Sequence, residues 1–384
     1  MGELISAVYH VAAEKAEAER IARWIAVEQT VEAPDQLIDA RIEEEIVGSV
    51  VSVEAVPDGR HAVRIEYRAE LAAGQLPQLL NLVYGNVSLF ESVRLVELEL
   101  PAELLASFRG PNLGGSGLRA LLGVHDRPLL STALKPRGRT DEELAAMAGE
   151  FALGGGDLVK DDHNLVDGYE AFRRRIALSH EAVARANERT GRNCLYVPNV
   201  CAPTEQLPRF VEYALDLGLR GVMVAPLILG LDTVRHLTAR YPIFVIAHPS
   251  FCGTFYRDPR HGIAARLLLG ALYRLAGIDI SILVSHGGRF NYPAEECVSV
   301  ADAVRAPLGS LRPGLPCPAG GMRFDRIPEL GRQYGAETLF LVGGALLGHT
   351  TSVRASTEAF LGRIREQFDE RCVDPRTDPR STDP

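Results

Sequence analysis

The stretch GGGDLVKDDH, residues 154–163, ends an apolar run with a lysine, two aspartates and a histidine. Lysine is scarce in this chain, because only Lys15, Lys135 and Lys160 are lysines among 41 Lys and Arg residues. An arginine keeps its proton in proteins, whereas a lysine amine loses it readily when buried. The lysine at position 160 therefore indicates chemistry that needs a neutral amine. We expect Lys135 to move protons or to contact a substrate oxygen.

The adjacent carboxylates of Asp161 and Asp162 suit a hard divalent cation. Mg²⁺ fits best, because it binds few protein oxygens and keeps positions open for substrate oxygens. His163 is an unusual neighbour, since imidazole prefers softer metals. The alternative is a solvated turn with ordinary charges. The KDDH stretch follows an apolar run and lies between three glycines and a helical pattern, and this position favours a functional site.

Composition limits the class of protein. The chain has 384 residues, of which 46% are hydrophobic and 24% charged, as is typical of globular proteins. A net charge of −9 argues against nucleic acid as the main partner, but allows an anionic substrate in a locally positive site. The six cysteines show no CxxC spacing, and neither a signal core nor a membrane-length apolar run is present. We expect a reduced, cytoplasmic protein that binds neither nucleic acid nor membrane.

The first part of the chain, residues 1–125, predicts a ferredoxin-like α+β domain. Periodicity indicates a strand, a helix, two strands around a PDGR turn, a second helix and a further strand. These elements lie at residues 4–12, 17–30, 43–57, 61–71, 76–86 and 93–101.

From about residue 128 the pattern changes to short β-rich runs that alternate with amphipathic helical stretches. Eight such units fit a (β/α)8 TIM barrel over residues 126–370, which makes the whole chain an α/β protein. The tail, residues 371–384, is polar and rich in proline, and is predicted to be disordered. The eight runs are PLLSTALKP, DLVKDD, CLYVPNV, GVMVAP, IFVIAHP, SILVSHG, LPCPAGG and LFLVGGA, of which the seventh is a poor strand by composition.

Polar residues at the carboxyl ends of these runs should converge, because that end of a barrel forms the active site. Lys135, Lys160, His248 and His286 all follow such runs. Lys135 could instead lie along the barrel rim, and the histidines could be satisfied core residues. Two glycine pairs follow the seventh and eighth runs, where backbone N–H groups commonly bind phosphate: Gly320, Gly321, Gly343 and Gly344. Together these features predict metal-assisted enolisation of a phosphorylated sugar.

The order of motifs resembles the RuBisCO large-chain family, and in particular its RuBisCO-like (form IV) members. The resemblance extends from about residue 20 to about residue 350. It rests on GNVSLFES, FRGPNLGG, STALKPRG, GGGDLVKDDH, AHP, PAGG and VGGALLGH. It implies the same two-domain architecture.

The resemblance also implies roles for individual residues. Lys160 matches a lysine that takes up CO2 as a carbamate and then binds Mg²⁺ together with Asp162, with His163 at the third ligand position. Lys135 matches a proton-handling lysine, and the histidines and glycine pairs match active-site and phosphate-binding positions. Arg137 occupies a substrate-binding position. Glu28 and Asn86 match residues that serve the site of a neighbouring subunit, which implies a homodimer or a higher assembly of dimers.

Departures from the family pattern argue against CO2 fixation. Carboxylases have KDDE where this chain has His163, and Pro249 stands where they have a phosphate-binding arginine. The loop SHGGRFNYP has no lysine to reach a carboxylation intermediate, and Arg289 lies near the strand. TVEAP replaces a threonine-tryptophan segment, so a bisphosphate substrate is not expected.

The sequence therefore predicts a RuBisCO-like enzyme that forms a metal-stabilised enediolate from a singly phosphorylated sugar or sugar acid. Its net reaction would be decarboxylation, isomerisation or tautomerisation, and His163 with the altered LKPRG motif favours a sugar-acid substrate. One alternative is the methionine-salvage enolase that acts on 2,3-diketo-5-methylthiopentyl-1-phosphate. An alternative from another class is a non-catalytic sugar-phosphate sensor.

Overall fold

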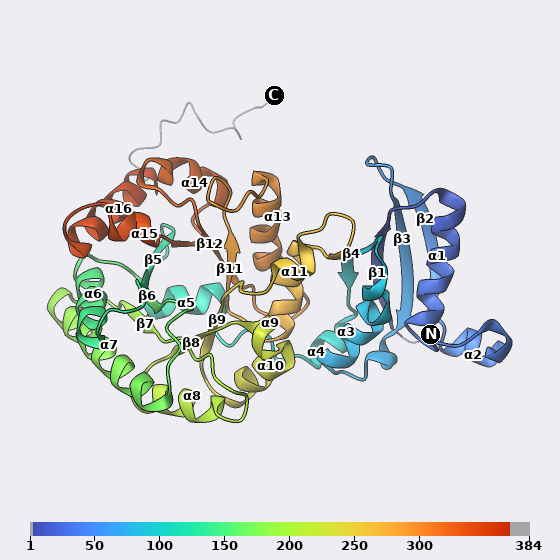
Figure 1. Ribbon diagram of the computed structural model, residues 1–384, viewed down its shortest axis with the longest axis horizontal. Helices are drawn as coiled ribbons and strands as arrows, with labels where there is room; N and C mark the ends of the chain where they lie inside the picture. The colour runs from blue at the N-terminus through green and yellow to red at the C-terminus, as the bar shows by residue number, and fades with distance from the viewer. Residues whose placement is uncertain (1–2, 369–384) are drawn as a thin grey trace.

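The N-terminal unit of the computed structural model, which describes residues 3–368, is a sheet with helices on one face (Figure 1). Its four antiparallel strands lie in the order β4-β1-β3-β2, which is the predicted ferredoxin-like arrangement. The elements are β1 (Leu4–Val11), α1 (Lys15–Glu28), α2 (Ala40–Glu45), β2 (Ser49–Ala55), β3 (His61–Arg68), α3 (Leu76–Tyr84) and β4 (Val93–Glu99), with 3-10 turns at Asp35–Leu37, Ala69–Ala72 and Asn86–Leu89.

Alternation along the strands explains why this sheet has one covered face. In β3, Val63, Ile65 and Tyr67 are buried, whereas the residues between them are only partly buried. Because successive side chains of a strand point to opposite faces, the buried set packs together beneath the helices. The apolar stripe of α1, which includes Ala22 and Ile25, belongs to the same core.

A fifth strand joins this sheet from the C-terminal half of the chain. β10 (Gly262–Ile263) pairs in parallel with β4, and the Gly262 N–H donates to the Tyr84 hydroxyl over 2.8 Å. The Ala264 N–H donates to the Leu95 carbonyl over 2.8 Å. The segment that follows β9 therefore links the two units.

The C-terminal unit is the predicted eight-stranded parallel barrel, with helices around it (Figure 1). A bridge between Asn199 and Met223 joins the end of β7 to β8 and closes the ring. All eight predicted runs contain a strand: β5 (Leu129–Leu134), β6 (Leu158–Asp161), β7 (Leu195–Val197), β8 (Gly221–Val224), β9 (Phe244–Ala247), β11 (Ile280–Val284), β12 (Leu315–Ala319) and β13 (Leu339–Leu341).

Short and long helices connect and cover these strands. Two of them, α4 (Ala102–Ala106) and α5 (Gly114–Leu122), precede the barrel. The remainder are α6 (Asp141–Leu153), α7 (Tyr169–Thr190), α8 (Leu207–Asp216), α9 (Pro226–Leu229), α10 (Leu231–Arg240), α11 (Gly253–Tyr256), a π-helix (Leu267–Leu272) that continues as α12 (Tyr273–Leu275), α13 (Ala294–Arg305), a 3-10 turn (Phe324–Arg326), α14 (Ile327–Tyr334), α15 (Gly344–Leu347) and α16 (Val353–Phe368). The predicted tail, residues 371–384, lies outside the described residues.

The proline-rich seventh strand pairs unequally with its neighbours. β12 is in register with β11 along its whole length, but with β13 only at Ala319. The Leu315 N–H donates to the Asp279 carbonyl, on the side of β11. Because successive N–H groups of a strand point to opposite neighbours, the N–H positions of residues 316 and 318 face β13. Both are prolines and have no N–H to donate. The prolines are tolerated because they fall on the side of the strand with little pairing.

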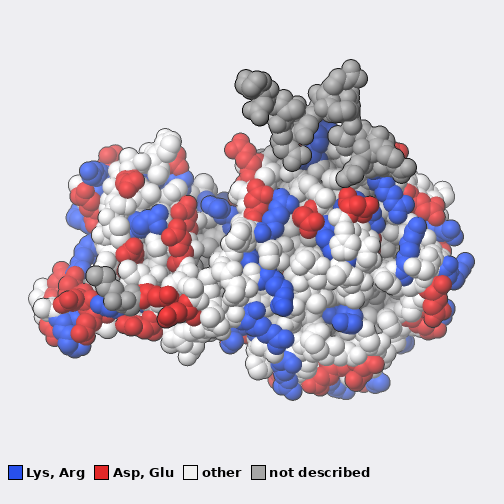
Figure 2. All heavy atoms as spheres, turned by 180° about the vertical axis from the view of Figure 1, so that it is seen from behind, with Lys and Arg blue, Asp and Glu red and all other residues white. Residues whose placement is uncertain are grey.

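Figure 2 shows acidic and basic side chains interspersed over one face of the molecule. Within residues 3–368, no helix combines the length and the apolar character that crossing a bilayer requires.

A buried carboxylate holds helix α5 against the barrel. Leu118 and Leu122 of α5 pack with the residues inside the barrel. Asp279, just before β11, is fully buried and accepts N–H bonds from Leu113 and Gly114 over 2.7 and 2.8 Å. Its other oxygen accepts from the Val245 N–H over 2.8 Å. Burial raises the pKa of Asp279 to about 6 despite these donors.

Replacing this carboxylate is expected to destabilise the barrel. In Asp279→Asn an amide NH2 faces at least one of the three N–H donors, so we expect the free energy of unfolding to fall by about 2 kcal/mol. Urea denaturation at a pH well above the Asp279 pKa measures this. Asp232→Asn, on the partly exposed helix α10, is the control and should change stability by less than ~0.5 kcal/mol. Equal effects of the two substitutions would contradict the role given to Asp279.

Candidate active site

Alternation along β6 decides which residues of the KDDH stretch face the barrel interior. Leu158 belongs to the cluster inside the barrel, and Val159 belongs to the core outside it. Lys160 therefore points inward, Asp161 outward and Asp162 inward again. Lys160 and Asp162 both line the cavity at the carboxyl end of the strands, and Asp161 does not.

Asp161 instead anchors the stretch from behind. It is fully buried and accepts hydrogen bonds from the Tyr196 hydroxyl over 2.7 Å and the Asn199 N–H over 3.1 Å. The buried guanidinium of Arg175 forms an ion pair with it at 3.1 Å. The Asn199 side-chain amide donates to the His163 carbonyl over 3.1 Å. This network fixes the backbone that carries Asp162 and His163.

Lys160 is almost completely buried. Only 2% of the residue is exposed, and its Nζ donates to the Asp161 carbonyl over 3.0 Å. Burial lowers its pKa to about 8, although the nearby Asp162 carboxylate acts in the opposite direction. A substantial fraction of this amine is therefore neutral under mildly alkaline conditions.

Asp162 lies between two basic side chains. Its Oδ2 lies 3.1 Å from Lys135 Nζ, and its Oδ1 lies 3.2 Å from His163 Nδ1. Burial acts to raise the pKa of Asp162, but His163, the Asn164 N–H and Lys135 together lower it. The carboxylate is thus ionised. Lys135 also lies against Gly343, where an added Cβ would be 3.5 Å from Nζ.

His248 is held neutral with a defined tautomer. Its ring stacks on His163, with centroids 4.2 Å apart and planes within 12°. Burial and the nearby Lys160 lower its pKa to about 2. The Ser250 N–H donates to His248 Nδ1 over 3.2 Å, so the proton of the neutral ring is on Nε2. His248 can therefore donate a hydrogen bond from Nε2.

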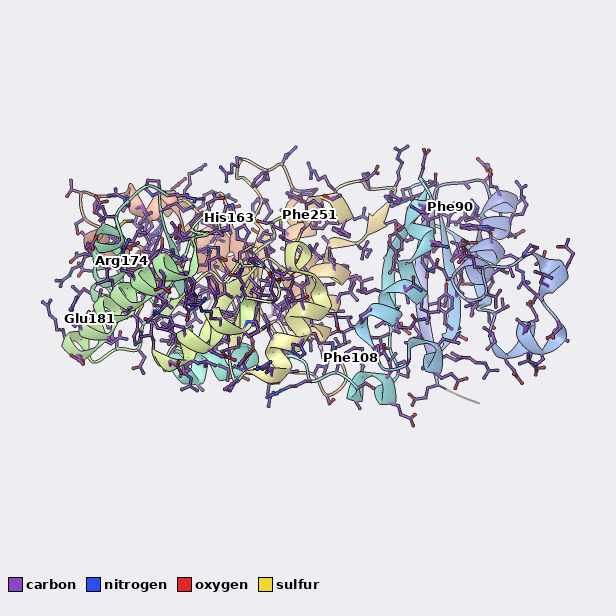
Figure 3. All side chains as sticks on the ribbon, turned by 60° about the horizontal axis from the view of Figure 1, so that its bottom comes forward. Phe90, Phe108, His163, Arg174, Glu181 and Phe251 are labelled. Carbon is purple, nitrogen blue, oxygen red and sulfur yellow. The ribbon has the colours of Figure 1, made fainter. Side chains whose placement is uncertain are left out.

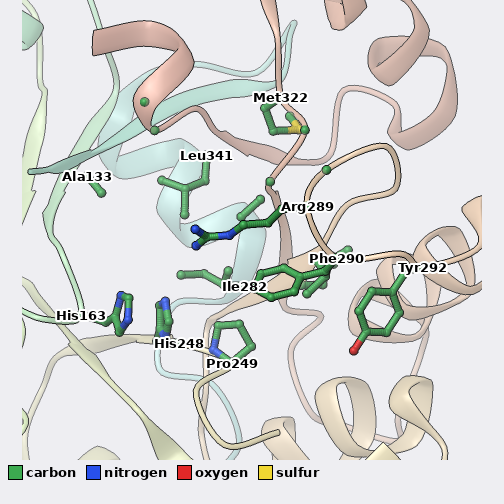
Figure 4. A pocket seen from close by; sticks show the side chains of 18 of the residues that line it. Ala133, His163, His248, Pro249, Ile282, Arg289, Phe290, Tyr292, Met322 and Leu341 are labelled. Atoms are coloured by element: carbon green, nitrogen blue, oxygen red, sulfur yellow. The ribbon is translucent and has the colours of Figure 1, made fainter. Parts of the chain in front are cut away.

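These groups line one end of a cavity of about 1130 Å³ (Figure 4). Figure 4 shows His163 and His248 side by side at one end, and Phe290 and Tyr292 at the other. Arg289 extends from the loop after β11 into the space between them. Figure 3 shows His163 and Phe251 on the same side of the barrel, whereas Arg174 and Glu181 lie along α7. Away from the two histidines the wall is largely apolar, with Ile282, Phe290, Tyr292 and Met322, and three arginines also line the cavity: Arg257, Arg289 and Arg323.

Both glycine pairs also line this cavity. Gly320 and Gly321 have φ angles of 85° and 65°, a left-handed conformation that favours glycine. Among the hydrogen bonds of residues 3–368, none uses the N–H of Gly320, Gly321, Gly343 or Gly344. Free N–H groups in successive residues can bind an anion, and phosphate binding at these glycines stays a prediction.

Other predicted site residues lie outside the cavity. His286 does not line it, and its Nε2 lies 2.8 Å from Glu329 Oε1 and 2.7 Å from Arg326 Nη2. Arg137 is exposed and donates weakly to the Val166 carbonyl over 3.4 Å.

Glu28 and Asn86 contact each other in the N-terminal unit. The Asn86 amide donates to Glu28 Oε1 over 2.9 Å, and neither residue lines the cavity of its own chain. Their predicted role in a neighbouring subunit stays a prediction.

Sequence reasoning did not identify the aromatic wall or the anchoring network. Phe290 and Tyr292 follow β11 in a loop without periodicity, so no pattern indicated their direction. The sequence does contain a signal for the role of Asp161. Side chains of a strand alternate between its two faces, so an inward Lys160 implies an outward Asp161. Arg289 was set aside as too near the strand, yet its side chain reaches into the cavity.

The donor set fits a divalent cation only in part. Among the described residues, no group of three or more His, Cys, Asp and Glu side chains is arranged to hold a metal ion. Asp162 supplies one carboxylate, and His163 already turns Nδ1 toward it. A carbamate on Lys160 would add the second anionic oxygen donor that a hard cation requires. The fit therefore depends on Lys160.

Comparisons with known proteins identify the family and the fold. Residues 115–366 match the family model described as ribulose bisphosphate carboxylase large chain, catalytic domain. The chain is 41% identical over 351 residues to ribulose bisphosphate carboxylase-like protein 1 of Rhodopseudomonas palustris, covering 90% of this chain and 94% of the relative. It is 37% identical over 377 residues to 5-methylthioribulose-1-phosphate isomerase of Rhodospirillum rubrum, covering 97% and 99%. The crystal structure of a Rubisco-like protein from Rhodopseudomonas palustris matches with a TM-score of 0.85 at 36% identity, covering 95% and 99%.

More distant matches share the same architecture. The chain is 33% identical over 311 residues to 2,3-diketo-5-methylthiopentyl-1-phosphate enolase of Geobacillus thermodenitrificans, covering 79% and 75%. A structure described as a dimeric archaeal Rubisco from Hyperthermus butylicus matches with a TM-score of 0.87 at 27% identity, covering 96% and 91%.

The buried amine should lower the stability of the fold in a pH-dependent way. A folded-state pKa of about 8, below the ordinary 10.5, means that the folded protein binds this proton less tightly than the unfolded chain. The cost is full below pH 8 and disappears as the pH rises toward 10.5. In buffer free of CO2 and metal, we therefore expect Lys160→Met to be more stable by about 2 kcal/mol near pH 7. The difference in unfolding free energy should shrink at alkaline pH, and a pH-independent difference would contradict the assignment.

Proposed function

The chain belongs to the RuBisCO large-chain family, and from this premise we propose that it is a RuBisCO-like isomerase or enolase, not a carboxylase. We propose that it moves a proton between adjacent carbons of a singly phosphorylated ketose. The observation that carries this proposal is the ion pair of Lys135 with Asp162, at 3.1 Å, beside the buried amine of Lys160.

Lys160 prepares the polar end of the cavity. Its neutral amine forms an N–C bond with CO2 and releases a proton, which leaves a carbamate beside Asp162. Mg²⁺ held by this carbamate and Asp162, next to His163, would polarise the carbonyl of a bound substrate. The pKa of about 8 supports this step, because the neutral amine is accessible without strongly alkaline conditions.

The chain's own groups then handle protons and charge. Once Lys135 has released the proton that it holds in the ion pair with Asp162, its neutral amine takes a proton from one carbon and returns it to the neighbouring carbon. His248 donates a hydrogen bond from Nε2 to a substrate oxygen, as its neutral tautomer permits. The free N–H groups of the glycine pairs hold the phosphate and orient the reacting carbons.

The apolar end of the cavity favours a substrate with an uncharged tail. Burying a second phosphate or a carboxylate against Ile282, Phe290 and Met322 themselves would be costly, although Arg257, Arg289 and Arg323 also line the cavity and would offset part of this cost. This weighs against the sugar-acid route that the sequence departures favoured. A methylthio group suits such a wall, and a relative that covers nearly the whole chain carries the name 5-methylthioribulose-1-phosphate isomerase. We therefore place 5-methylthioribulose 1-phosphate first among candidate substrates.

A second candidate uses the same cavity. The relative named 2,3-diketo-5-methylthiopentyl-1-phosphate enolase also acts on a singly phosphorylated compound with a methylthio tail. The two substrates differ in the carbonyl pattern and in the hydroxyl group at C4, so supplying each substrate separately distinguishes the two activities.

The direct test uses the three lysines of the chain. With Mg²⁺ and bicarbonate, the protein should isomerise 5-methylthioribulose 1-phosphate, as followed by NMR, and exchange a substrate proton with D2O. We expect Lys135→Met and Lys160→Met to lower kcat by about 10³-fold, because each removes a group that acts on the reacting atoms. Lys15→Met, at the exposed start of α1, is the matched control and should retain full activity.

Other outcomes would replace this proposal. Turnover of only the diketo substrate would assign the enolase activity. Tight binding without proton exchange would indicate a sensor. Incorporation of CO2 into ribulose bisphosphate would overturn the non-carboxylase assignment.

We also propose a homodimer in which Glu28 and Asn86 serve the partner's cavity. The pair is held together at 2.9 Å but lies outside the cavity of its own chain. If each site needs both chains, Glu28→Ala and Lys160→Met should each be inactive alone. Co-expressing the two variants should restore about a quarter of the activity. Half of the dimers are then heterodimers, and each heterodimer has one intact site of its two. No recovery, with heterodimers verified by mass spectrometry, would contradict the shared site.

A further inference from the structure

Arg326 lies behind the cavity, where it joins two loops of the active-site face. Its side chain is only 10% exposed, and the residue is not among those that line the cavity. Glu329 fixes the guanidinium in two places, through Nε at 3.0 Å and Nη2 at 2.9 Å. The remaining nitrogen, Nη1, is thereby directed toward the loops.

Nη1 bridges the loops that follow β11 and β12. It donates to the His286 carbonyl over 2.8 Å and to the Gly321 carbonyl over 3.1 Å. The His286 ring contributes a further contact, at 2.7 Å from Nη2. The planar guanidinium presents five N–H donors in a fixed geometry, so it can reach all these acceptors at once. The ammonium group of a lysine has three donors on one nitrogen and could not.

The two loops then meet backbone to backbone. A Cβ at Gly288 would be 2.8 Å from the Gly321 nitrogen, and a Cβ at Gly321 would be 2.7 Å from the Gly288 nitrogen. Gly287 leaves room for Arg326 itself, since a Cβ there would be 2.3 Å from Nη1. Glycine at these positions permits a contact that any side chain would open.

This contact brings free N–H groups of both loops to one wall of the cavity. Gly288 and Gly321 both line the cavity, and among the hydrogen bonds of residues 3–368 neither N–H has a protein acceptor. Arg289 follows directly in the chain and extends its side chain into the same space. The two loops therefore form one composite site for an anion, instead of two separate ones.

We infer that Arg326 is a positioning residue, which holds the loops after β11 and β12 together as a single phosphate-binding surface. The inference rests on the proposed function, in which the glycine pairs, Gly321 among them, receive the phosphate of the substrate, and it adds the loop after β11 to that surface. It also gives His286 and Glu329 a role. They orient the guanidinium and do not contact substrate.

Direct binding of inorganic phosphate to the full-length protein tests this inference. In Arg326→Gln, we expect the phosphate Kd from calorimetry to rise about tenfold, since the loop N–H groups no longer converge. The KM for a phosphorylated substrate should rise by a similar factor, while kcat changes by less than about threefold, because the lysines and Asp162 are untouched. Arg326→Lys should restore binding only partly.

Two further variants separate positioning from general destabilisation. Gly288→Ala leaves Arg326 intact but forces the loops apart, so it should weaken phosphate binding to a similar extent. Arg305→Gln is the matched control, because Arg305 also bonds two carbonyls and a carboxylate, at Tyr334, Glu337 and Asp302. It should lower the melting temperature without changing the phosphate Kd.

The possible outcomes are decisive. A phosphate Kd in Arg326→Gln within twofold of the parent protein would overturn the inference, as would an equal loss in Arg305→Gln or no phosphate binding by the parent. If the parent protein binds phosphate and Arg326→Gln does not, but the parent turns over no substrate, the proposed function fails and the inference stands. If the parent is an active isomerase and Arg326→Gln is unaffected, only the inference fails.

Discussion

The site depends on one amine that is buried beside a carboxylate. Lys160 is 2% exposed, and its strand neighbour Leu158 is packed in the barrel interior. Transfer of an ammonium group out of water is costly, so burial favours the neutral form that carbamylation needs. The carboxylate of Asp162 limits this effect, since it favours the charged form. The balance of the two places the pKa near 8, where either form is accessible.

The remainder of the barrel serves to keep these groups in place. Outward-pointing Asp161 binds Arg175, Tyr196 and Asn199, so the strand end cannot rotate without breaking a buried network. On the opposite side, the loops after β11 and β12 are held by Arg326. The chain between His248 and β10 then runs directly into the sheet of the N-terminal unit. The groups proposed for proton transfer, those proposed for anion binding and the interface between the units are therefore supported by different elements.

Much of this arrangement was predictable because strands and rare residues leave clear signals. Eight apolar runs gave the barrel, and the scarcity of lysine singled out Lys135 and Lys160. Even the run with Pro316 and Pro318 forms its strand, because both prolines fall on the weakly paired side. His286 shows the limit. Its partners, Arg326 and Glu329, are about 40 residues away in sequence, so only the packing of two loops reveals that its ring is occupied.

The charges around Asp162 explain why the altered KDDH motif fits proton transfer better than carboxylation. With both lysines protonated, two positive groups surround one aspartate, and a divalent cation is repelled. A carbamate on Lys160 replaces a positive charge with a negative one, so the same site becomes attractive to a cation. The motif offers no further carboxylate, because an imidazole occupies position 163 and stacks on His248. A cation held by two anionic groups suffices to polarise one carbonyl for proton transfer. Holding a carboxylation intermediate as well would require additional charged contacts. The loop after β11 has no lysine for this purpose, and the arginines at the aromatic wall stack on its rings, Arg289 over Phe290 and Arg257 over Tyr292.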